Sequence, residues 1–341
     1  MVRVLVADDS AVTREYLVYL LDAHPDLEVV GTARDGLEAV EQAERLRPDV
    51  IVMDVMMPRM DGHEATRQIM ERAPAPIVMV SASGSHDDVA MTFEAVKAGA
   101  LAFQQKPRGP GHPDYVEDAR RLVETVSLMA EVKVVRRWAK REPQRPAAPP
   151  PKVNRVRVIA IGASTGGPQT IAEILGGLST SLAVPILVVQ HIAPGFVDGL
   201  AEWLNRETPL AVKVAEPDEV TLPGTVYIAP NAMQMGISSN GRIHLEAEAV
   251  RDGFCPSASH LFKSVADAYG QSAMGILLTG MGRDGADGLQ QVHQAGGLTV
   301  AQDEESSVIF GMPGAAVAMG AAQYVLSATE IVELIGSATV A

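Results

Sequence analysis

Three polar residues in the second half of the chain each follow an apolar run that predicts a β-strand. Ser164 follows residues 156–163, His191 follows residues 186–190, and Asp284 lies in the glycine-rich stretch LLTGMGRDGADG after another such run. Polar residues at the carboxyl ends of parallel strands gather on one edge of a sheet. Together they predict a hydrolytic triad, in which Ser164 attacks, His191 accepts its proton and Asp284 holds the imidazole.

Each member of this group also has a simpler interpretation. Ser164 alone could cap a helix that begins near Pro168, and a single histidine such as His191 is more often structural than catalytic. Asp287 lies on the same loop as the predicted aspartate and is an alternative partner for the imidazole. The glycines around Met281 would let backbone N–H groups face a developing oxyanion, which favours the catalytic interpretation.

The same loop also matches a dinucleotide-binding pattern. Gly280, Gly282 and Gly285 form the sequence G-x-G-x-x-G, and Asp303 ends the next predicted strand, about where a ribose-binding acid would lie. The pattern is short, and it occurs late in its domain rather than after the first strand. Because it leaves the serine and the histidine unexplained, we favour hydrolysis over nicotinamide cofactor binding.

Polar groups also end the predicted strands of the first half of the chain. These residues are Asp8, Asp9, Asp54, Ser81 and Lys106. Three carboxylates close together repel one another and need a hard cation such as Mg²⁺, whereas a lysine and a hydroxyl beside them suit phosphoryl oxygens. An aspartate can itself be the nucleophile that forms an acyl phosphate. Helix capping would explain one of the first two aspartates, but not five such residues at successive strand ends.

Parallel strands must position both groups, and the hydrophobic pattern supplies them in each half of the chain. Apolar runs alternate with helical patterns, which predicts two doubly wound α/β domains with helices on both faces of a parallel sheet. Between residues 211 and 245 we predict additional antiparallel strands. The predicted strands of the first half are 3–8, 28–33, 49–54, 76–82 and 101–107, and those of the second are 156–164, 186–191, 225–230, 273–280 and 297–303.

Length and composition support two domains joined by a linker. The chain has 341 residues, of which 47% are hydrophobic, so it can form two cores. Residues 142–151, EPQRPAAPPP, contain five prolines and follow a helical pattern over residues 114–141. We therefore predict one domain at 1–122, a helical and proline-rich linker at 123–153, and a second domain at 154–341.

Charge and cysteine content exclude several classes of protein. The net charge of −14 argues against a nucleic-acid binder, and the single cysteine excludes an internal disulfide and a cysteine-based zinc site. The N-terminus turns acidic after seven residues, unlike a signal peptide, and the two long uncharged stretches are interrupted by Gly, Pro, Ser or Gln. We expect a cytoplasmic protein that neither inserts into a membrane nor binds nucleic acid.

The first 106 residues resemble the receiver domain of response regulators, which has a flavodoxin-like fold with a parallel five-stranded sheet. The resemblance is carried, in order, by the motifs ADDS (7–10), MDVMMPRMDG (53–62), VSA (80–82) and KP (106–107). It implies that Asp54 is the phosphoacceptor and that a histidine kinase is the phosphodonor.

The receiver resemblance also implies a Mg²⁺ site and groups that sense the phosphoryl group. The metal ligands would be Asp9, Asp54 and the backbone carbonyl of Met56, with Asp8 acting through water. Ser81 and Lys106 would contact the phosphoryl group. Phe103 lies where the family has its switch aromatic, although plain core packing explains it equally well. Gln104 and Gln105 are unusually polar for the last strand, which leaves its pairing open.

The second half resembles the chemotaxis protein-glutamate methylesterases of the CheB family through GASTGGP (162–168), QHIAPGF (190–196) and GMGRDGA (280–286). The resemblance implies a Rossmann-like α/β hydrolase domain that needs no metal or organic cofactor for its reaction. It implies hydrolysis of glutamyl methyl esters on methyl-accepting chemotaxis receptors, with methanol released, and deamidation of certain glutamines.

For the site, this resemblance implies the triad Ser164, His191 and Asp284, with the Met281 amide in the oxyanion hole. Two segments expected near the site depart from the family pattern. Cys255 stands where an arginine usually precedes Pro-Ser, and Gln234 stands where a histidine is usual. The reaction type is therefore better determined than the choice of substrate.

One chain joins a predicted sensor domain to a predicted hydrolase domain, which suggests that the first regulates the second. We expect the protein to be a monomer. We hypothesise that the unphosphorylated receiver covers the catalytic edge and that phosphorylation weakens this contact. The basic stretch 133–145 could bind an acidic partner or simply be a solvated helix. A binding module without catalysis and a DNA-binding regulator are the alternatives, disfavoured by the intact triad and by the acidic second half.

Overall fold

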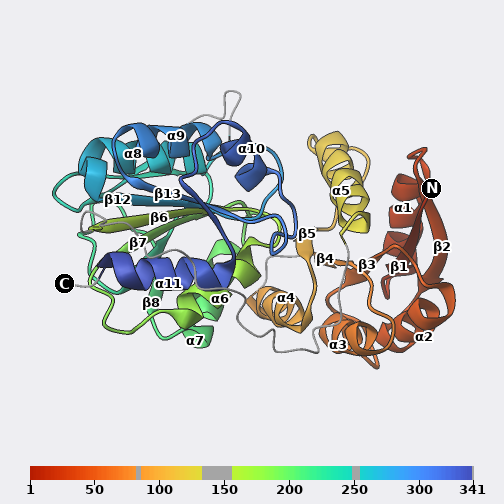
Figure 1. The fold of residues 1–341 in the computed structure, drawn as a ribbon. Coiled ribbons are helices and arrows are strands. Elements are labelled where there is room, and N and C mark those ends of the chain that lie inside the picture. The colour runs from red at the N-terminus through yellow and green to blue at the C-terminus, as the bar shows by residue number, and fades with distance from the viewer. Residues whose placement is uncertain (82–85, 133–155, 248–253, 340–341) are drawn as a thin grey trace. The chain divides into compact units, whose positions relative to one another are not determined.

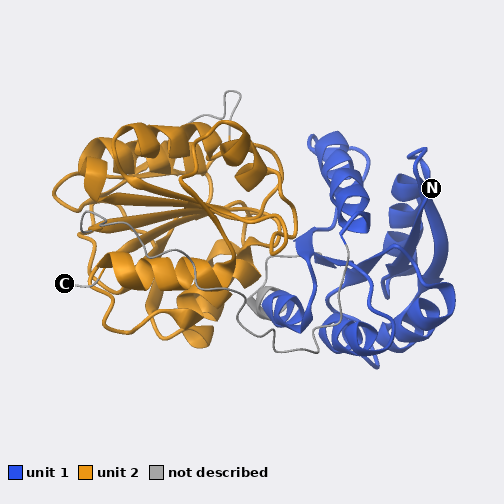
Figure 2. Ribbon diagram, in the orientation of Figure 1, with its two compact units in different colours: residues 1–142 blue, residues 143–341 orange. Residues whose placement is uncertain are grey.

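The computed structural model describes residues 1–81, 86–132, 156–247 and 254–339 (Figure 1). The chain divides into two compact units, residues 1–142 and 143–341, which are described separately below (Figure 2). The predicted proline-rich linker and the basic stretch 133–145 lie outside the described residues. No helix in the described part of the chain is both long enough and apolar enough to cross a membrane.

The first unit is a parallel sheet of five strands with helices on both faces (Figure 1). The strand order β2-β1-β3-β4-β5 confirms the flavodoxin-like arrangement. Helices α1 and α5 cover one face, and α2, α3 and α4 cover the other (Figure 1). The strands are β1 (Val2–Ala7), β2 (Leu27–Ala33), β3 (Val50–Asp54), β4 (Ile77–Ser81) and β5 (Ala102–Gln105), and the helices are α1 (Ala11–Asp22), α2 (Gly36–Leu46), α3 (Gly62–Arg72), α4 (His86–Ala98) and α5 (Tyr115–Ala130).

Local sequence explains where the helices of this unit begin. Ser10, Asp35 and Asp61 each precede a helix, and their side chains accept a hydrogen bond from a backbone N–H in its first turn. Helix α5 continues through residue 122, where we predict the domain boundary, and it buries Leu122 together with two later apolar residues. The apolar face of α5 thus contributes to the packing of the first unit at residue 122 and beyond it.

The pairing of the last strand, left open by its two glutamines, is parallel to β4. Val80 lies opposite Gln104 and Ser81 lies opposite Gln105. Gln104 is buried, and its Oε1 accepts a hydrogen bond from Thr125 Oγ1 of α5 at 3.3 Å. A polar side chain is therefore tolerated on this strand because the covering helix supplies a partner.

The second unit contains a parallel sheet of seven strands in the order β14-β13-β12-β6-β7-β9-β8. Its central strands are fully buried apolar runs, as expected when helices cover both faces. The strands are β6 (Val158–Ala163), β7 (Ile186–Gln190), β8 (Ala211–Val214), β9 (Thr225–Ile228), β12 (Ala273–Leu277), β13 (Leu298–Gln302) and β14 (Tyr324–Leu326).

Two groups of helices enclose this sheet. One face carries α8, α9 and α10, and the other carries α6, α7 and α11 (Figure 1). The first group packs over a core that includes Phe262, Leu289 and Met312. The helices are α6 (Gly167–Gly177), α7 (Val197–Glu207), α8 (Ala258–Tyr269), α9 (Ala286–Gln294), α10 (Met312–Ala318) and α11 (Ala328–Thr339).

The segment 211–245 corrects one prediction and confirms another. Strands β10 (Gln234–Ile237) and β11 (Ile243–Glu246) form the expected antiparallel pair. Strands β8 and β9 are parallel, so an antiparallel pairing for them is wrong. Their connection pairs with β11 instead, because Asp218 N–H donates to the Ile243 carbonyl and Ile243 N–H donates to the Glu219 carbonyl. This pairing lets the chain return and begin β9 in the same direction as β8.

Candidate functional site

Ser164 lies immediately after β6 and three residues before α6, at a sharp strand-to-helix turn. Its backbone N–H donates to the Thr279 carbonyl at 3.0 Å, and its carbonyl accepts from Gly167 N–H at 2.8 Å. The buried side chain of Gln190 donates from Nε2 to the same carbonyl at 2.8 Å. The backbone of Ser164 is therefore fixed from three directions, while its side chain remains half-buried at the edge of the sheet.

Glycines allow this close packing. Gly166 has φ +78°, and a Cβ built on it would lie 2.5 Å from Val308 Cγ2. A Cβ built on Gly280 would lie 2.7 Å from Ser164 Cβ. The loop after β12 thus passes directly beside Ser164 because glycine stands at the point of contact.

His191 follows β7 and contacts the carboxylate of Asp284, which lies on the loop between β12 and α9. His191 Nε2 and Asp284 Oδ2 are 2.9 Å apart, and the side chains are only 12% and 7% exposed. The backbone N–H of His191 donates to the Ala163 carbonyl at 2.9 Å, which ties it to the end of β6 beside Ser164. The structure therefore brings the three predicted residues to the carboxyl ends of adjacent strands. Within the described residues, no hydrogen bond joins the Ser164 hydroxyl to His191.

The start of α8 surrounds the Asp284 carboxylate with donors. Ser257 Oγ donates to Oδ1 at 2.8 Å, the Ala258 N–H donates to Oδ2 at 2.7 Å, and the Ser259 N–H donates to Oδ1 at 3.2 Å. Burial by itself raises the pKa of Asp284, but the hydrogen bonds from His191, Ser257 and Ala258 outweigh it and hold the pKa well below its usual range. The carboxylate is ionised at neutral pH and oriented by a helix N-terminus.

Ser257 belongs to the candidate site by its contact with Asp284, and the sequence did not point to it. It is the N-cap of α8, since its Oγ accepts from His260 N–H, and the same hydroxyl donates to Asp284. A serine that follows proline and precedes a helical pattern is a recognisable capping signal. Its contact with the aspartate could not be read from that signal, because the two residues lie 27 positions apart.

The structure also distinguishes between the alternative residues predicted for the second unit. Asp287 is 60% exposed and pairs with Arg283, so the structure places Asp284, and not Asp287, beside His191. The Met281 N–H makes no hydrogen bond to any described residue, and Met281 lies one residue beyond the contact with Ser164. Asp303 accepts hydrogen bonds from Ser306, where the dinucleotide-binding interpretation needs it free for a ribose.

The first unit gathers its acidic residues as the sequence predicts. Carboxylate oxygens of Asp8, Asp9 and Asp54 all lie within 4.8 Å of one another. Lys106 Nζ lies 2.8 Å from Asp8 Oδ2 and 2.7 Å from Asp54 Oδ2. An all-oxygen donor set of this size fits Mg²⁺, which prefers hard oxygen ligands. One cation could be held by these carboxylates while the lysine balances part of their charge.

The Asp54 carboxyl is electrostatically unusual. Burial raises its pKa to about 6, against the opposing effect of the hydrogen bond from Lys106. The charge on Asp8 contributes to this raised pKa, whereas the charge on Lys106 and a backbone hydrogen bond from Met56 lower it. Burial also lowers the pKa of Lys106, but its contacts with Asp54 and Asp8 raise the pKa above the usual value. Like charges crowded in a buried site favour a bound cation.

The remaining predicted residues of this unit lie near the same edge. Ser81 is buried, and its carbonyl accepts from the Lys106 N–H at 2.8 Å. Phe103 lies opposite Met79 and packs edge-on against Phe93, with ring centroids 5.3 Å apart. The contact is consistent with core packing, so a switching role for Phe103 stays a prediction.

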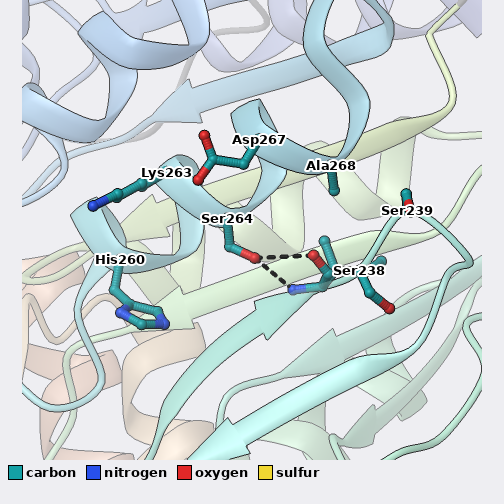
Figure 3. A pocket seen from close by; sticks show the side chains of 8 residues that line it. Ser238, Ser239, His260, Lys263, Ser264, Asp267 and Ala268 are labelled. Atoms are coloured by element: carbon teal, nitrogen blue, oxygen red, sulfur yellow. Dashed lines mark hydrogen bonds between the residues drawn. The ribbon is translucent and has the colours of Figure 1, made fainter.

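An open hollow of about 450 Å³ lies elsewhere on the second unit, between β10 and the polar face of α8 (Figure 3). Ser164, His191 and Asp284 do not line it. It is lined by Ile237, Ser238, Ser239, His260, Lys263, Ser264, Asp267 and Ala268.

Fold and arrangement define a receiver domain followed by a parallel α/β unit with a candidate hydrolytic site. Residues 4–112 match the response regulator receiver domain family, and residues 159–335 match the family CheB methylesterase. The chain belongs to this family of methylesterases that carry a receiver domain.

Individual relatives agree with this assignment. Protein-glutamate methylesterase/protein-glutamine glutaminase 4 of Myxococcus xanthus (strain DK1622) is 49% identical over 98% of this chain and 96% of its own length. A protein-glutamate methylesterase/protein-glutamine glutaminase of Nitrosospira multiformis is 48% identical over 97% of this chain and 95% of its own. The crystal structure of the Thermotoga maritima CheB methylesterase catalytic domain is 37% identical, with a TM-score of 0.51, and covers 53% of this chain and 98% of that one.

Proposed function

We propose that this protein hydrolyses glutamyl methyl esters on chemoreceptors, and deamidates certain glutamines, under the control of phosphorylation. The observation that carries the proposal is the buried His191–Asp284 pair at the same sheet edge as Ser164. Its relatives bear the names of both activities. Fold alone would not decide between hydrolases, so the proposal depends on this site.

The geometry supports a two-step acyl transfer. The Ser164 hydroxyl attacks the ester carbonyl as His191 takes its proton, and the Met281 N–H, which bonds to none of the described residues, faces the oxyanion that forms. The C–O bond then breaks, and the imidazolium returns the proton to methoxide, which leaves as methanol. Water attacks the resulting acyl-enzyme in the same way and releases the glutamate. For a glutamine substrate the leaving group is ammonia.

The orientation of the imidazole supports a different role for each of its nitrogens in this proposal. Nε2 is the nitrogen that contacts Asp284, at 2.9 Å. Nδ1 is therefore the nitrogen that accepts the serine proton. Asp284 stays ionised through the cycle, since its pKa lies far below that of an ordinary carboxyl. It stabilises the imidazolium without itself taking the proton.

In the first unit we propose that Asp54 accepts the phosphoryl group from a histidine kinase of a chemosensory pathway. Asp9 and Asp54, the Met56 carbonyl, and Asp8 through water would hold Mg²⁺, which neutralises charge on the phosphoryl group when bound. Lys106, at 2.7 Å from Asp54, and Ser81 would contact the phosphoryl oxygens. The esterase reaction needs no cofactor in this proposal, and the chain acts as a cytoplasmic monomer.

Replacing the proposed nucleophile tests the reaction. We expect Ser164→Ala to abolish methanol release from methylated receptor membranes, because no other hydroxyl replaces the attacking group. The residue is half-buried and its hydroxyl makes no hydrogen bond to a described residue, so the circular dichroism spectrum and melting temperature should stay unchanged. Ester hydrolysis by a folded Ser164→Ala protein would remove Ser164 as the nucleophile.

A further inference from the structure

A short segment, residues 254–257, touches both members of the His191–Asp284 pair. At one end, Phe254 stacks on His191, with ring centroids 4.5 Å apart and planes inclined by 11°. At the other end, Ser257 donates to the Asp284 carboxylate. Phe254 is 53% exposed, so burial of its own ring does little to hold it in place. Another group must therefore fix the backbone of this segment.

Gln234 is that group. Its Nε2 donates to the Phe254 carbonyl at 2.8 Å, and its Oε1 accepts from the Ser257 N–H at 2.8 Å. A carbonyl can only accept and an N–H can only donate, so only one orientation of the amide satisfies both contacts. Gln234 is only 6% exposed and lies at the start of β10, where the sheet hairpin holds it.

We propose that Gln234 is a positioning residue for the reaction, whose amide clamps residues 254–257 so that Phe254 stays on His191 and Ser257 stays on Asp284. It touches neither member of the pair itself and acts through both ends of the segment. The amide is suited to this because one planar group offers a donor and an acceptor side by side. The inference rests on the proposed hydrolysis and specifies what orients its general base and the carboxylate beside that base.

The closing experiment compares three variants of the full chain. Gln234→Leu removes the donor and the acceptor at similar volume, so we expect kcat to fall by about 10²-fold through misplacement of the imidazole, with KM nearly unchanged. Gln234→His should restore most of kcat, since a neutral imidazole again offers one donor and one acceptor.

Ser264→Ala is the matched control. Ser264 Oγ also makes two hydrogen bonds to this hairpin, accepting from the Ile237 N–H at 2.7 Å and donating to the Ile237 carbonyl at 3.0 Å (Figure 3). It contacts neither end of residues 254–257. We expect Ser264→Ala to lose stability but to keep the wild-type kcat.

A spectroscopic measurement separates this inference from the proposed function. In the ¹⁵N-histidine-labelled full chain, the proton between His191 and Asp284 should give a resonance that Gln234→Leu shifts or broadens and Ser264→Ala does not. Absence of ester hydrolysis by the wild type would defeat the proposed function while leaving this resonance as the test of positioning. A folded Gln234→Leu protein with unchanged kcat and an unchanged resonance would overturn the inference, as would an equal loss of kcat in Ser264→Ala.

Discussion

Among single residues, Asp284 is the one whose carboxylate ties the candidate site together. Four donors converge on one carboxylate: the His191 ring, the Ser257 hydroxyl and two backbone N–H groups of α8. A charge-assisted network of this kind orients the imidazole and favours its protonated form while the serine attacks. The aspartate therefore links the start of α8 to the proposed chemistry.

We expect Asp284→Asn to lower kcat for methyl ester hydrolysis by about 10⁴-fold, with a smaller change in KM. The amide would place donor hydrogens against the donors of α8 and would no longer stabilise the imidazolium. Asp287→Asn is the matched control, since Asp287 lies on the same loop but is exposed in a surface pair with Arg283. Similar losses of kcat in the two variants would contradict the assignment of Asp284.

The lowered pKa of Asp284 also predicts a pH dependence of stability. Because the folded-state pKa lies below the unfolded value of about 3.9, the ionised carboxylate stabilises the fold fully above the unfolded value, and the stabilisation is lost as pH falls toward the folded value. Asp284→Asn should therefore lose stability at pH 7 and show less further loss below pH ~4. Urea unfolding of both proteins across pH 3–7 measures this, and parallel pH profiles would refute it.

At the scale of elements, the strand-to-helix turn after β6 is the feature on which Ser164 depends. Gly166 has a left-handed backbone conformation there and contacts Val308 closely. An alanine at this position would be strained by its φ and would collide with the valine. The turn would then have to shift, and Ser164 with it.

Gly166→Ala should accordingly lower the free energy of unfolding of the catalytic unit by ~1–3 kcal/mol, and it should reduce kcat. Gly176→Ala is the control, in the helix that follows this turn, because no atom lies within 4 Å of a Cβ at Gly176 and its φ is not positive. That variant should gain about 0.5–1 kcal/mol and keep its activity. Denaturant unfolding followed by tryptophan fluorescence gives both values, and equal stabilities would refute the argument.

The helices and strands also show which features of the fold and of the candidate site could be predicted from the sequence. Strand ends marked by Asp8, Asp54 and Ser164 could be found because a short apolar run followed by a polar residue is a local pattern. The parallel pairing of β8 and β9 could not, since it depends on a connection that bonds to β11. The contact of Gln234 with residues 254–257 likewise forms only when the hairpin packs beside α8.

At the scale of the whole molecule, each of the two units has its own group of chemically reactive side chains. The first gathers two carboxylates and a lysine around Asp54, and the second brings together a histidine and an aspartate beside Ser164. Neither group contains a residue of the other unit. Phosphorylation can therefore influence hydrolysis only through a free-energy difference between states of the whole chain.

We expect acetyl phosphate with Mg²⁺ to raise kcat/KM for methanol release by about 5- to 150-fold, the range of typical coupling free energies. Asp54→Asn should remove this response, because its amide cannot form the acyl phosphate. Asp26→Asn replaces an exposed acid of the same unit and should keep the response. The rate is measured on methylated receptor membranes with and without the phosphodonor. An Asp54→Asn protein that still responded would show that the phosphodonor acts elsewhere, and the proposed link between the two units would then have to be abandoned.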